Sequence, residues 1–286
     1  MYYLLLSVAA VASIVVAFKV FLPDCNQLES STLQQLDSNC SELEQSILPR
    51  LDVGEPFLAK AASTCFNWLS DLSERTLECL SAETIERLYF NRGLSLTIKG
   101  QWEGAKSAFS EALALNTNSA RAINGLGILA FYEGDFSATL SYFERATQLE
   151  KETSGYWLNL GIFYLYMGQN ENAERALQEA YSLDPHSPYP SLYQAKLLWI
   201  NGDVVSAENF YRRSYEADPG REDVVEELCR FYLMEQPSTT AITWINSQSV
   251  IENSQSASCL RLKKMIGVSL QQGTSVGHTG NSEETS

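Results

Sequence analysis

Few side chains in this sequence combine in a way that would support catalysis. Of the two histidines, His186 lies in the loop Asp184-Pro185-His186-Ser187-Pro188 between two predicted repeats and His278 lies near the C-terminal end, so neither is placed with an acid and a nucleophile as in a catalytic triad. The Gly-Leu-Gly segment at 125–127 lies within a helical pattern, unlike the strand-to-helix loop that binds phosphate. Acidic pairs such as Glu222 with Asp223 are typical of solvated helix surfaces. We therefore predict a protein that is not an enzyme and that needs no cofactor.

The cysteines are the other candidates for chemistry, and their spacing argues against a metal site. No two form a C-x-x-C pair, and none has a histidine at the sequence spacing of zinc ligands. Two interpretations stay open: disulfides, if the protein works in an oxidising compartment, or small buried apolar side chains, which Cys229 illustrates. The six are Cys25, Cys40, Cys65, Cys79, Cys229 and Cys259.

The charge balance of the chain argues against nucleic acid as a partner. The 286 residues include 35 acidic and 20 basic side chains, which gives a formal net charge of -15. A protein that grips phosphate backbones needs the opposite sign. Hydrophobic residues make up 45% of the chain, enough for a continuous core.

Regularly spaced small residues are the main structural signal. Between residues 86 and 221 one small residue recurs every 34 positions, as Gly93, Gly127, Gly161 and Ala195. A second set at the same spacing is Gly100, Gly134, Gly168 and Gly202. Large residues follow at Phe109, Phe143, Leu177 and Tyr211. We interpret the first set as the positions where two helices pack closely and the second as the turns between helices. The large residues of the third set fill the space between neighbouring repeats.

This pattern resembles the tetratricopeptide repeat class, in which each repeat is a helix-turn-helix that is stable only when stacked on its neighbours. The resemblance predicts an all-α, right-handed solenoid of four to five repeats with capping helices. The four clear repeats are predicted at 86–119, 120–153, 154–187 and 188–221. Capping helices are expected at 55–85, and a degenerate fifth repeat with a C-terminal helix at 222–270.

The segments before and after this array carry separate predictions. Residues 1–22 are apolar enough and long enough to predict an uncleaved transmembrane helix. A cleaved signal peptide, or a lipoprotein modified at Cys25, are the alternatives. Residues 23–54 are predicted to form a polar linker with a short amphipathic helix, which starts at a capping box on Ser31. Residues 271–286 are predicted to be a disordered tail.

The short amphipathic helix leaves the oligomeric state open. Leu36 and Cys40 belong to a narrow apolar seam, which would either lie on the solenoid or pair with a second copy. In the second case the chain would be a homodimer, and Cys40 could cross-link it.

The predicted anchor also gives a localisation. The scarcity of Lys and Arg after residue 22 favours a single-pass membrane protein whose repeat domain is periplasmic. The alternatives are the cytoplasmic face of the membrane and secretion after signal cleavage.

Resemblance to the repeat class also implies where a partner would bind. The first helix of each repeat lines the concave face, and here that face is rich in apolar and aromatic residues, which usually marks a partner site. The predicted partner-binding residues are Arg87, Phe90, Arg121, Asn124, Phe131, Tyr132, Leu158, Leu165, Tyr166, Lys196 and Trp199. Ile200 belongs to the same set of groove positions. The alternative is that the protein's own terminal helices cover part of the groove.

Residues 83–235 are similar, more specifically, to bacterial envelope adaptors of the new-lipoprotein-I type. The motifs are LYFNRGLSL at 88–96, AFSEALAL at 108–115, NGLGI at 124–128, DPHSPYPSLY at 184–193 and EELCRFYL at 226–233. That resemblance implies a periplasmic, dimeric scaffold that brings peptidoglycan hydrolases to a protease. We therefore expect a membrane-anchored adaptor that binds a peptide or helix of another envelope protein. The alternative is an assembly factor of a pilus or secretion machine that acts by oligomerisation.

Overall fold

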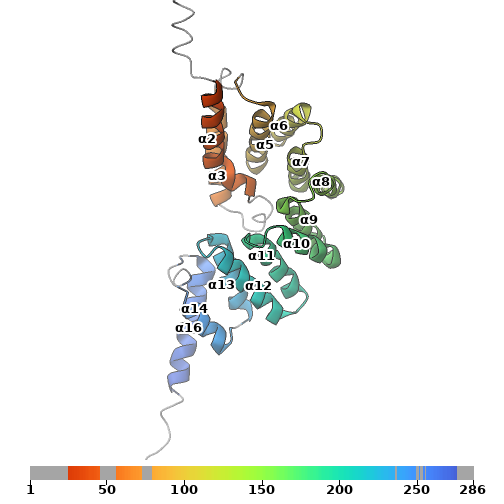
Figure 1. The fold of residues 1–286 in the computed structure, drawn as a ribbon. Helices are drawn as coiled ribbons and strands as arrows, with labels where there is room; N and C mark the ends of the chain where they lie inside the picture. The colour runs from red at the N-terminus through yellow and green to blue at the C-terminus, as the bar shows by residue number, and fades with distance from the viewer. Residues whose placement is uncertain are drawn as a thin grey trace, which may run out of the picture. The chain divides into compact units, whose positions relative to one another are not determined.

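The computed structural model describes residues 25–45, 56–72, 79–235, 237–248, 251, 254 and 256–275. Within these ranges all regular secondary structure is helical, as expected (Figure 1). The chain divides into two compact units. Unit 1 holds the helices up to residue 149, and unit 2 holds the helices from residue 150 onward.

Unit 1 contains two N-terminal helices followed by two antiparallel helix pairs. Helices α2 and α3 precede the pairs α5 with α6 and α7 with α8, which are the first two predicted repeats. Their bounds are α2 Cys25–Gln45, α3 Pro56–Ser70, α5 Ala82–Ile98, α6 Trp102–Leu115, α7 Ala120–Glu133 and α8 Phe136–Leu149.

Unit 2 contains the third and fourth repeats and the C-terminal helices. Helices α9 and α10 form one pair, α11 and α12 the next, and α13 packs against both α12 and α16. The bounds are α9 Ser154–Tyr166, α10 Asn170–Leu183, α11 Pro188–Ile200, α12 Val204–Ala217, α13 Glu222–Glu235, α14 Thr239–Asn246 and α16 Ala257–Ser275.

The turns inside the four repeats share one conformation. Each has a glycine in the left-handed region: Gly100 (φ 70), Gly134 (φ 80), Gly168 (φ 68) and Gly202 (φ 84). In each, the next residue donates its N–H to the carbonyl five residues back: Gln101 to Leu96, Asp135 to Ala130, Gln169 to Tyr164 and Asp203 to Leu198. This is the Schellman bond that closes a helix end. The predicted role of these glycines is confirmed.

The small residues inside the first helices allow close packing, also as predicted. A Cβ atom on Gly93 would lie 2.5 Å from the Phe109 ring, and one on Gly125 would lie 2.4 Å from the same ring. Phe109 therefore fits between the first helices of two successive repeats, α5 and α7. A side chain at either glycine would force the ring out of place.

At the N-terminal end of unit 1, α2 and α3 form a cap on α5. A disulfide joins Cys40 of α2 to Cys65 of α3. Leu36 and Cys40 are fully buried, so the amphipathic seam is used within the chain, and the predicted cross-link through Cys40 is wrong. The helix begins at Cys25, and the Ser31 hydroxyl donates to the Leu28 carbonyl inside it, so the predicted capping box is also wrong.

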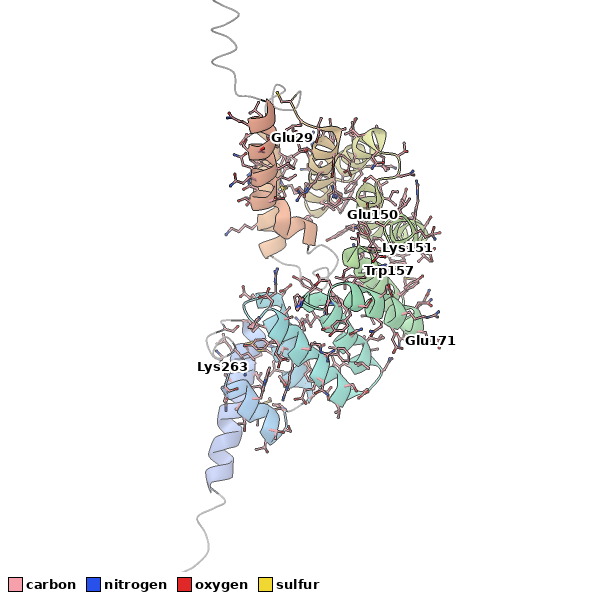
Figure 2. All side chains as sticks on the ribbon, in the orientation of Figure 1. Glu29, Glu150, Lys151, Trp157, Glu171 and Lys263 are labelled. Atoms are coloured by element: carbon pink, nitrogen blue, oxygen red, sulfur yellow. A yellow bond between two sulfur atoms is a disulfide. The ribbon has the colours of Figure 1, made fainter. Side chains whose placement is uncertain are left out.

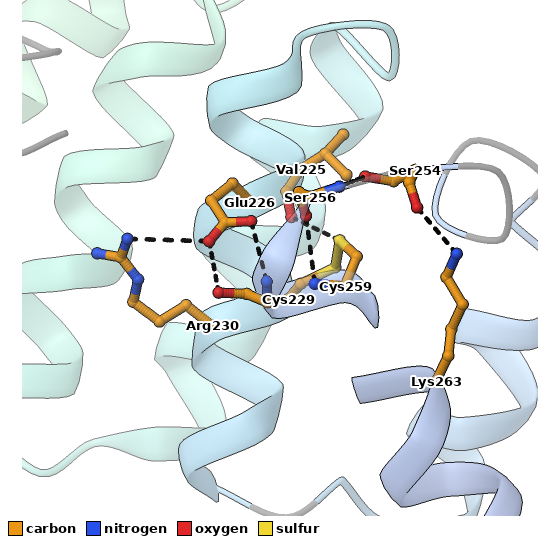
Figure 3. Close-up of a disulfide and its surroundings, with 9 residues drawn as sticks. Val225, Glu226, Cys229, Arg230, Ser254, Ser256, Cys259 and Lys263 are labelled. Atoms are coloured by element: carbon orange, nitrogen blue, oxygen red, sulfur yellow. Dashed lines mark hydrogen bonds and ion pairs between the residues drawn. A yellow bond between two sulfur atoms is a disulfide. The ribbon is translucent and has the colours of Figure 1, made fainter. Parts of the chain in front are cut away.

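At the C-terminal end of unit 2, a second disulfide joins α13 to α16, between Cys229 and Cys259 (Figure 3). Glu226 of α13 accepts hydrogen bonds from the hydroxyl and the backbone N–H of Ser258 at the start of α16. Lys263 donates to the Ser254 carbonyl at 2.9 Å. Cys229 is therefore a disulfide partner, rather than the free buried cysteine of the second interpretation.

The predicted single-pass membrane localisation is corrected by the structure. None of the helices in the described ranges is long and apolar enough to span a membrane. A span needs about 20 predominantly apolar residues, whereas the 21 residues of α2 are mostly polar and α16 carries Arg261, Lys263 and Lys264. Residues 1–22, which carry the anchor prediction, lie outside the described residues.

Candidate functional site

The histidine that the structure describes does not belong to a catalytic cluster. His186 is exposed in the turn before α11, where its backbone N–H donates to the Asp184 side chain at 3.2 Å. No group of three or more His, Cys, Asp or Glu side chains that could hold a metal ion occurs in the described part of the chain. The candidate site is therefore the face of the first helices, where the sequence predicts a partner.

In unit 1, the two predicted arginines are engaged with carboxylates of the same unit. Arg87 of α5 forms an ion pair with Asp37 of α2 at 2.8 Å, so the N-terminal cap reaches this predicted groove position. Arg121 of α7 pairs with Glu86 at 3.3 Å. The carboxylate of Glu86, 8% exposed, also accepts a hydrogen bond from Ser119.

The apolar and amide positions of unit 1 are mostly covered. Phe90 and Asn124 are each 5% exposed. Phe131 and Tyr132 are half-buried. The Tyr132 ring stacks on Trp102 of the preceding repeat with 6.1 Å between centroids. Burial raises the pKa of the Tyr132 hydroxyl to about 12, so it stays neutral.

In unit 2, several predicted residues are also satisfied by neighbours. Leu158 is 5% exposed, and Leu165 is half-buried. Lys196 of α11 pairs with Glu227 of α13 at 3.5 Å, with both side chains largely buried. The Trp199 indole donates to Glu235, and its ring packs on Tyr211 and Phe231.

One row of apolar side chains in unit 2 stays open to solvent. The row consists of Tyr166 at the end of α9, Ile200 at the end of α11 and Met234 next to the end of α13. Successive members are 34 residues apart in the sequence. Their exposed fractions are 60%, 65% and 66%. We call these three residues the exposed row. Met234 is absent from the predicted set because its repeat is degenerate, although the 34-residue register places it there.

A cleft also opens on unit 2, between α9 and α10. It has a volume of about 620 Å³, with Trp157, Leu160 and Tyr164 of α9 on its apolar side and Arg175 and Glu179 of α10 on its polar side. The Trp157 indole donates to the Lys151 carbonyl at 2.7 Å, and Figure 2 shows both residues at the start of this helix pair. The apolar wall consists of regular helix-face positions, at intervals of three and four residues.

Comparison with known proteins supports the repeat assignment. A family model described as tetratricopeptide repeat matches residues 158–222. Superkiller protein 3 of Saccharomyces cerevisiae is 29% identical over 119 residues, 42% of this chain and 8% of that protein. The lipoprotein NlpI homolog of Haemophilus influenzae is 28% identical over 121 residues, 42% of this chain and 37% of that protein. The chain thus matches well under half the length of either relative.

Solved structures agree on the fold. Yeast Tom70 superposes with a TM-score of 0.56 at 16% identity, over 87% of this chain and 59% of that one. TTC0263, a tetratricopeptide repeat protein of Thermus thermophilus, superposes with a TM-score of 0.51 at 17% identity, over 65% of this chain and 99% of that one. Together with the four left-handed glycine turns and the glycine contacts, these matches support a chain with the tetratricopeptide repeat fold.

Proposed function

We propose that the protein is a non-catalytic adaptor that binds a segment of another protein on the first-helix face of its repeats. The exposed row carries this proposal. Large apolar side chains that stay more than half exposed at one repeat position are costly to leave in water unless a partner covers them. Proteins of this repeat class are in general interaction scaffolds.

The contacts within the chain change the expected roles of the charged groove residues. Arg87, Arg121 and Lys196 each already have a carboxylate partner in the same unit. An acidic group of a partner could pair with one of these side chains only if the existing ion pair were broken. The free energy lost with the old pair would offset part of the free energy gained from the new one. The proposal therefore assigns the main binding energy to apolar contacts.

The disulfides support a location of the protein in an oxidising compartment, outside the reducing cytosol. Cys40–Cys65 and Cys229–Cys259 are both bonded, and Cys79 is disulfide-bonded as well. Such bonds persist in oxidising compartments. Together with the likeness to the lipoprotein NlpI homolog, they support the narrower proposal that the partner is a protein of the bacterial envelope.

Assembly through oligomerisation is the weaker candidate. The seam that would pair with a second copy includes Leu36 and Cys40, and both are buried against the chain's own helices. A surface that is already covered contributes little to self-association.

Site-specific photocrosslinking in the native cells tests the proposal. A photoreactive residue at Ile200 of the full chain should yield one crosslinked protein, mapped by mass spectrometry to a single segment that also binds the purified chain. The same residue at Leu115, 43% exposed in unit 1 on the second helix α6, is the control and should give no such product. If Ile200 and Tyr166 both give no product beyond that of Leu115, the adaptor proposal is wrong.

A further inference from the structure

The exposed row lies among other open apolar side chains at one edge of unit 2. Met167, 41% exposed, follows Tyr166 in the turn after α9, and Val205, 75% exposed, lies in the first turn of α12. We call the described segments 166–171, 200–205, 234–235 and 237–239 the turn edge. It holds five of the large hydrophobic side chains that unit 2 exposes: Tyr166, Met167, Ile200, Val205 and Met234.

Packing of the helices sets the distance between members of the exposed row. Helix α11 contacts both α9 and α13, so the three residues lie on successive neighbours. Packed helices lie roughly 8–10 Å apart. On an α-helix, side chains seven residues apart are separated by about 10.5 Å on one face. A partner helix with heptad-spaced apolar residues would therefore meet the three side chains in order.

The turn edge is acidic. Its charged residues are Glu171, Asp203 and Glu235, and its sequence contains no Lys, Arg or His. Glu171 is exposed in the first turn of α10, as Figure 2 shows. Asp203 is exposed and caps α12 by accepting from the Ser206 N–H at 3.1 Å. Glu235 lies beside Trp199, from which it accepts a hydrogen bond.

We propose that the turn edge of unit 2 binds a basic amphipathic helix of the partner protein. Its apolar residues, at heptad spacing, cover Tyr166, Ile200 and Met234, and its flanking Lys and Arg side chains lie near the three carboxylates. This inference rests on the proposed adaptor function and names the class of its partner. The same carboxylates repel an anionic lipid surface, so the acidic edge favours a basic protein segment over a membrane.

Peptide binding to the purified, oxidised full chain tests the inference. The probes are three fluorescent helical peptides of equal length: heptad-spaced Leu with flanking Lys, the same Leu pattern with Glu, and the Lys peptide with its Leu positions scrambled. Fluorescence anisotropy should show that the first peptide binds at least roughly tenfold more tightly than either of the others. Its affinity should fall as salt is added, because exposed charges are screened.

Variants locate the binding. The triple change Tyr166→Ser, Ile200→Ser and Met234→Ser should weaken binding of the Lys peptide by at least roughly tenfold. The matched control, Leu115→Ser with Leu260→Ser, removes exposed apolar residues elsewhere and should bind normally. The charge variant Glu171→Gln with Asp203→Asn keeps a capping side chain at 203 and should reduce both affinity and salt dependence. Circular dichroism checks that each variant remains folded.

Several results would overturn the inference. These are failure of the Lys peptide to bind, equal binding of the Glu peptide, and normal binding by the triple variant. Self-association of the chain, or adsorption to vesicles containing phosphatidylserine, that the triple change abolishes would assign the edge to a second copy or to a membrane instead. If crosslinking at Ile200 identifies a partner segment without a basic helix, this inference fails while the adaptor function stands.

Discussion

Equivalent positions in the two units differ in what covers the end of the first helix. In unit 1, Trp102 at the start of α6 stacks on Tyr132 of the next repeat and leaves it half-buried. In unit 2, Asn170 occupies the position of Trp102, bonds Asn201 at 2.7 Å, and leaves Ile200 65% exposed. In these two pairs, the second helix begins with a large aromatic residue where the end of the next first helix is half-buried, and with a small amide residue where it is exposed.

Charge differs along with coverage. The turn segments of unit 1, 98–103 and 132–137, include Lys99, whose ammonium lies 3.7 Å from the centre of the Phe66 ring of the cap. The turn edge of unit 2 has no cation in its sequence. The turns of the two units therefore differ in their side chains and charge, while the glycines in them have the same left-handed backbone conformation.

Removal of each disulfide should have the largest effect and should show whether the units are stabilised separately. We expect Cys40→Ala with Cys65→Ala, and separately Cys229→Ala with Cys259→Ala, to lower the free energy of unfolding by about 2–5 kcal/mol. Hydrogen exchange should speed up mainly in the unit that lost its bridge. Equal acceleration in both units after either change would contradict independent stabilisation.

Added methyl groups at two glycines should have opposite signs in the two units. Gly93→Ala in α5 should destabilise by about 1–3 kcal/mol, because its Cβ would lie 2.5 Å from the Phe109 ring. Gly155→Ala in α9, where the new Cβ meets nothing within 4 Å, should stabilise by about 0.5 kcal/mol. Urea unfolding measures both. A similar loss for both changes would show that glycine packing is not the cause.

Exchange of the covering residue should convert one unit toward the other. Trp102→Asn should cost about 0.5–1.5 kcal/mol and expose Tyr132, because the ring contact is lost. Asn170→Trp should leave stability almost unchanged but shield Ile200 and weaken capture of the partner at that position. The crosslinking yield at Ile200 reports the second effect, and an unchanged yield would disprove the covering role of this position.

Acid should loosen the terminal helices of both units, the smallest of the expected effects. Hydrogen bonds from Ser81 and Thr84 lower the pKa of Glu29. Burial alone would raise the pKa of Glu226, but hydrogen bonds from Ser256 and Ser258 outweigh it and leave the pKa below its usual value.

Because both folded-state pKa values are depressed, the stabilisation is present above the ordinary value of 4.5 and is lost as pH falls through the folded values. Hydrogen exchange near α2 and α16 below pH 4.5 should show the loss. In the control Glu226→Gln, the pH dependence near α16 should be smaller, and an unchanged dependence there would exclude Glu226 as its source.

The residues that could be predicted from sequence are those whose conformation only one residue type tolerates. The left-handed turns at Gly100 and Gly134, and the close contact at Gly93, follow from the absence of a side chain. The pairing of Cys40 with Cys65 has no comparable signal, because spacing along the chain does not say which helices meet. Helical periodicity identified the face that holds Tyr132, but coverage of that face depends on Trp102 of another repeat.

The two bridges with known partners each close a short stretch of chain, with sequence separations of 25 and 30, and each lies within one unit. Each unit can therefore close its bridge with its own cysteines, whether or not the other unit has folded. The N-terminal cap can thus be cross-linked covalently without any contribution from the turn edge of unit 2.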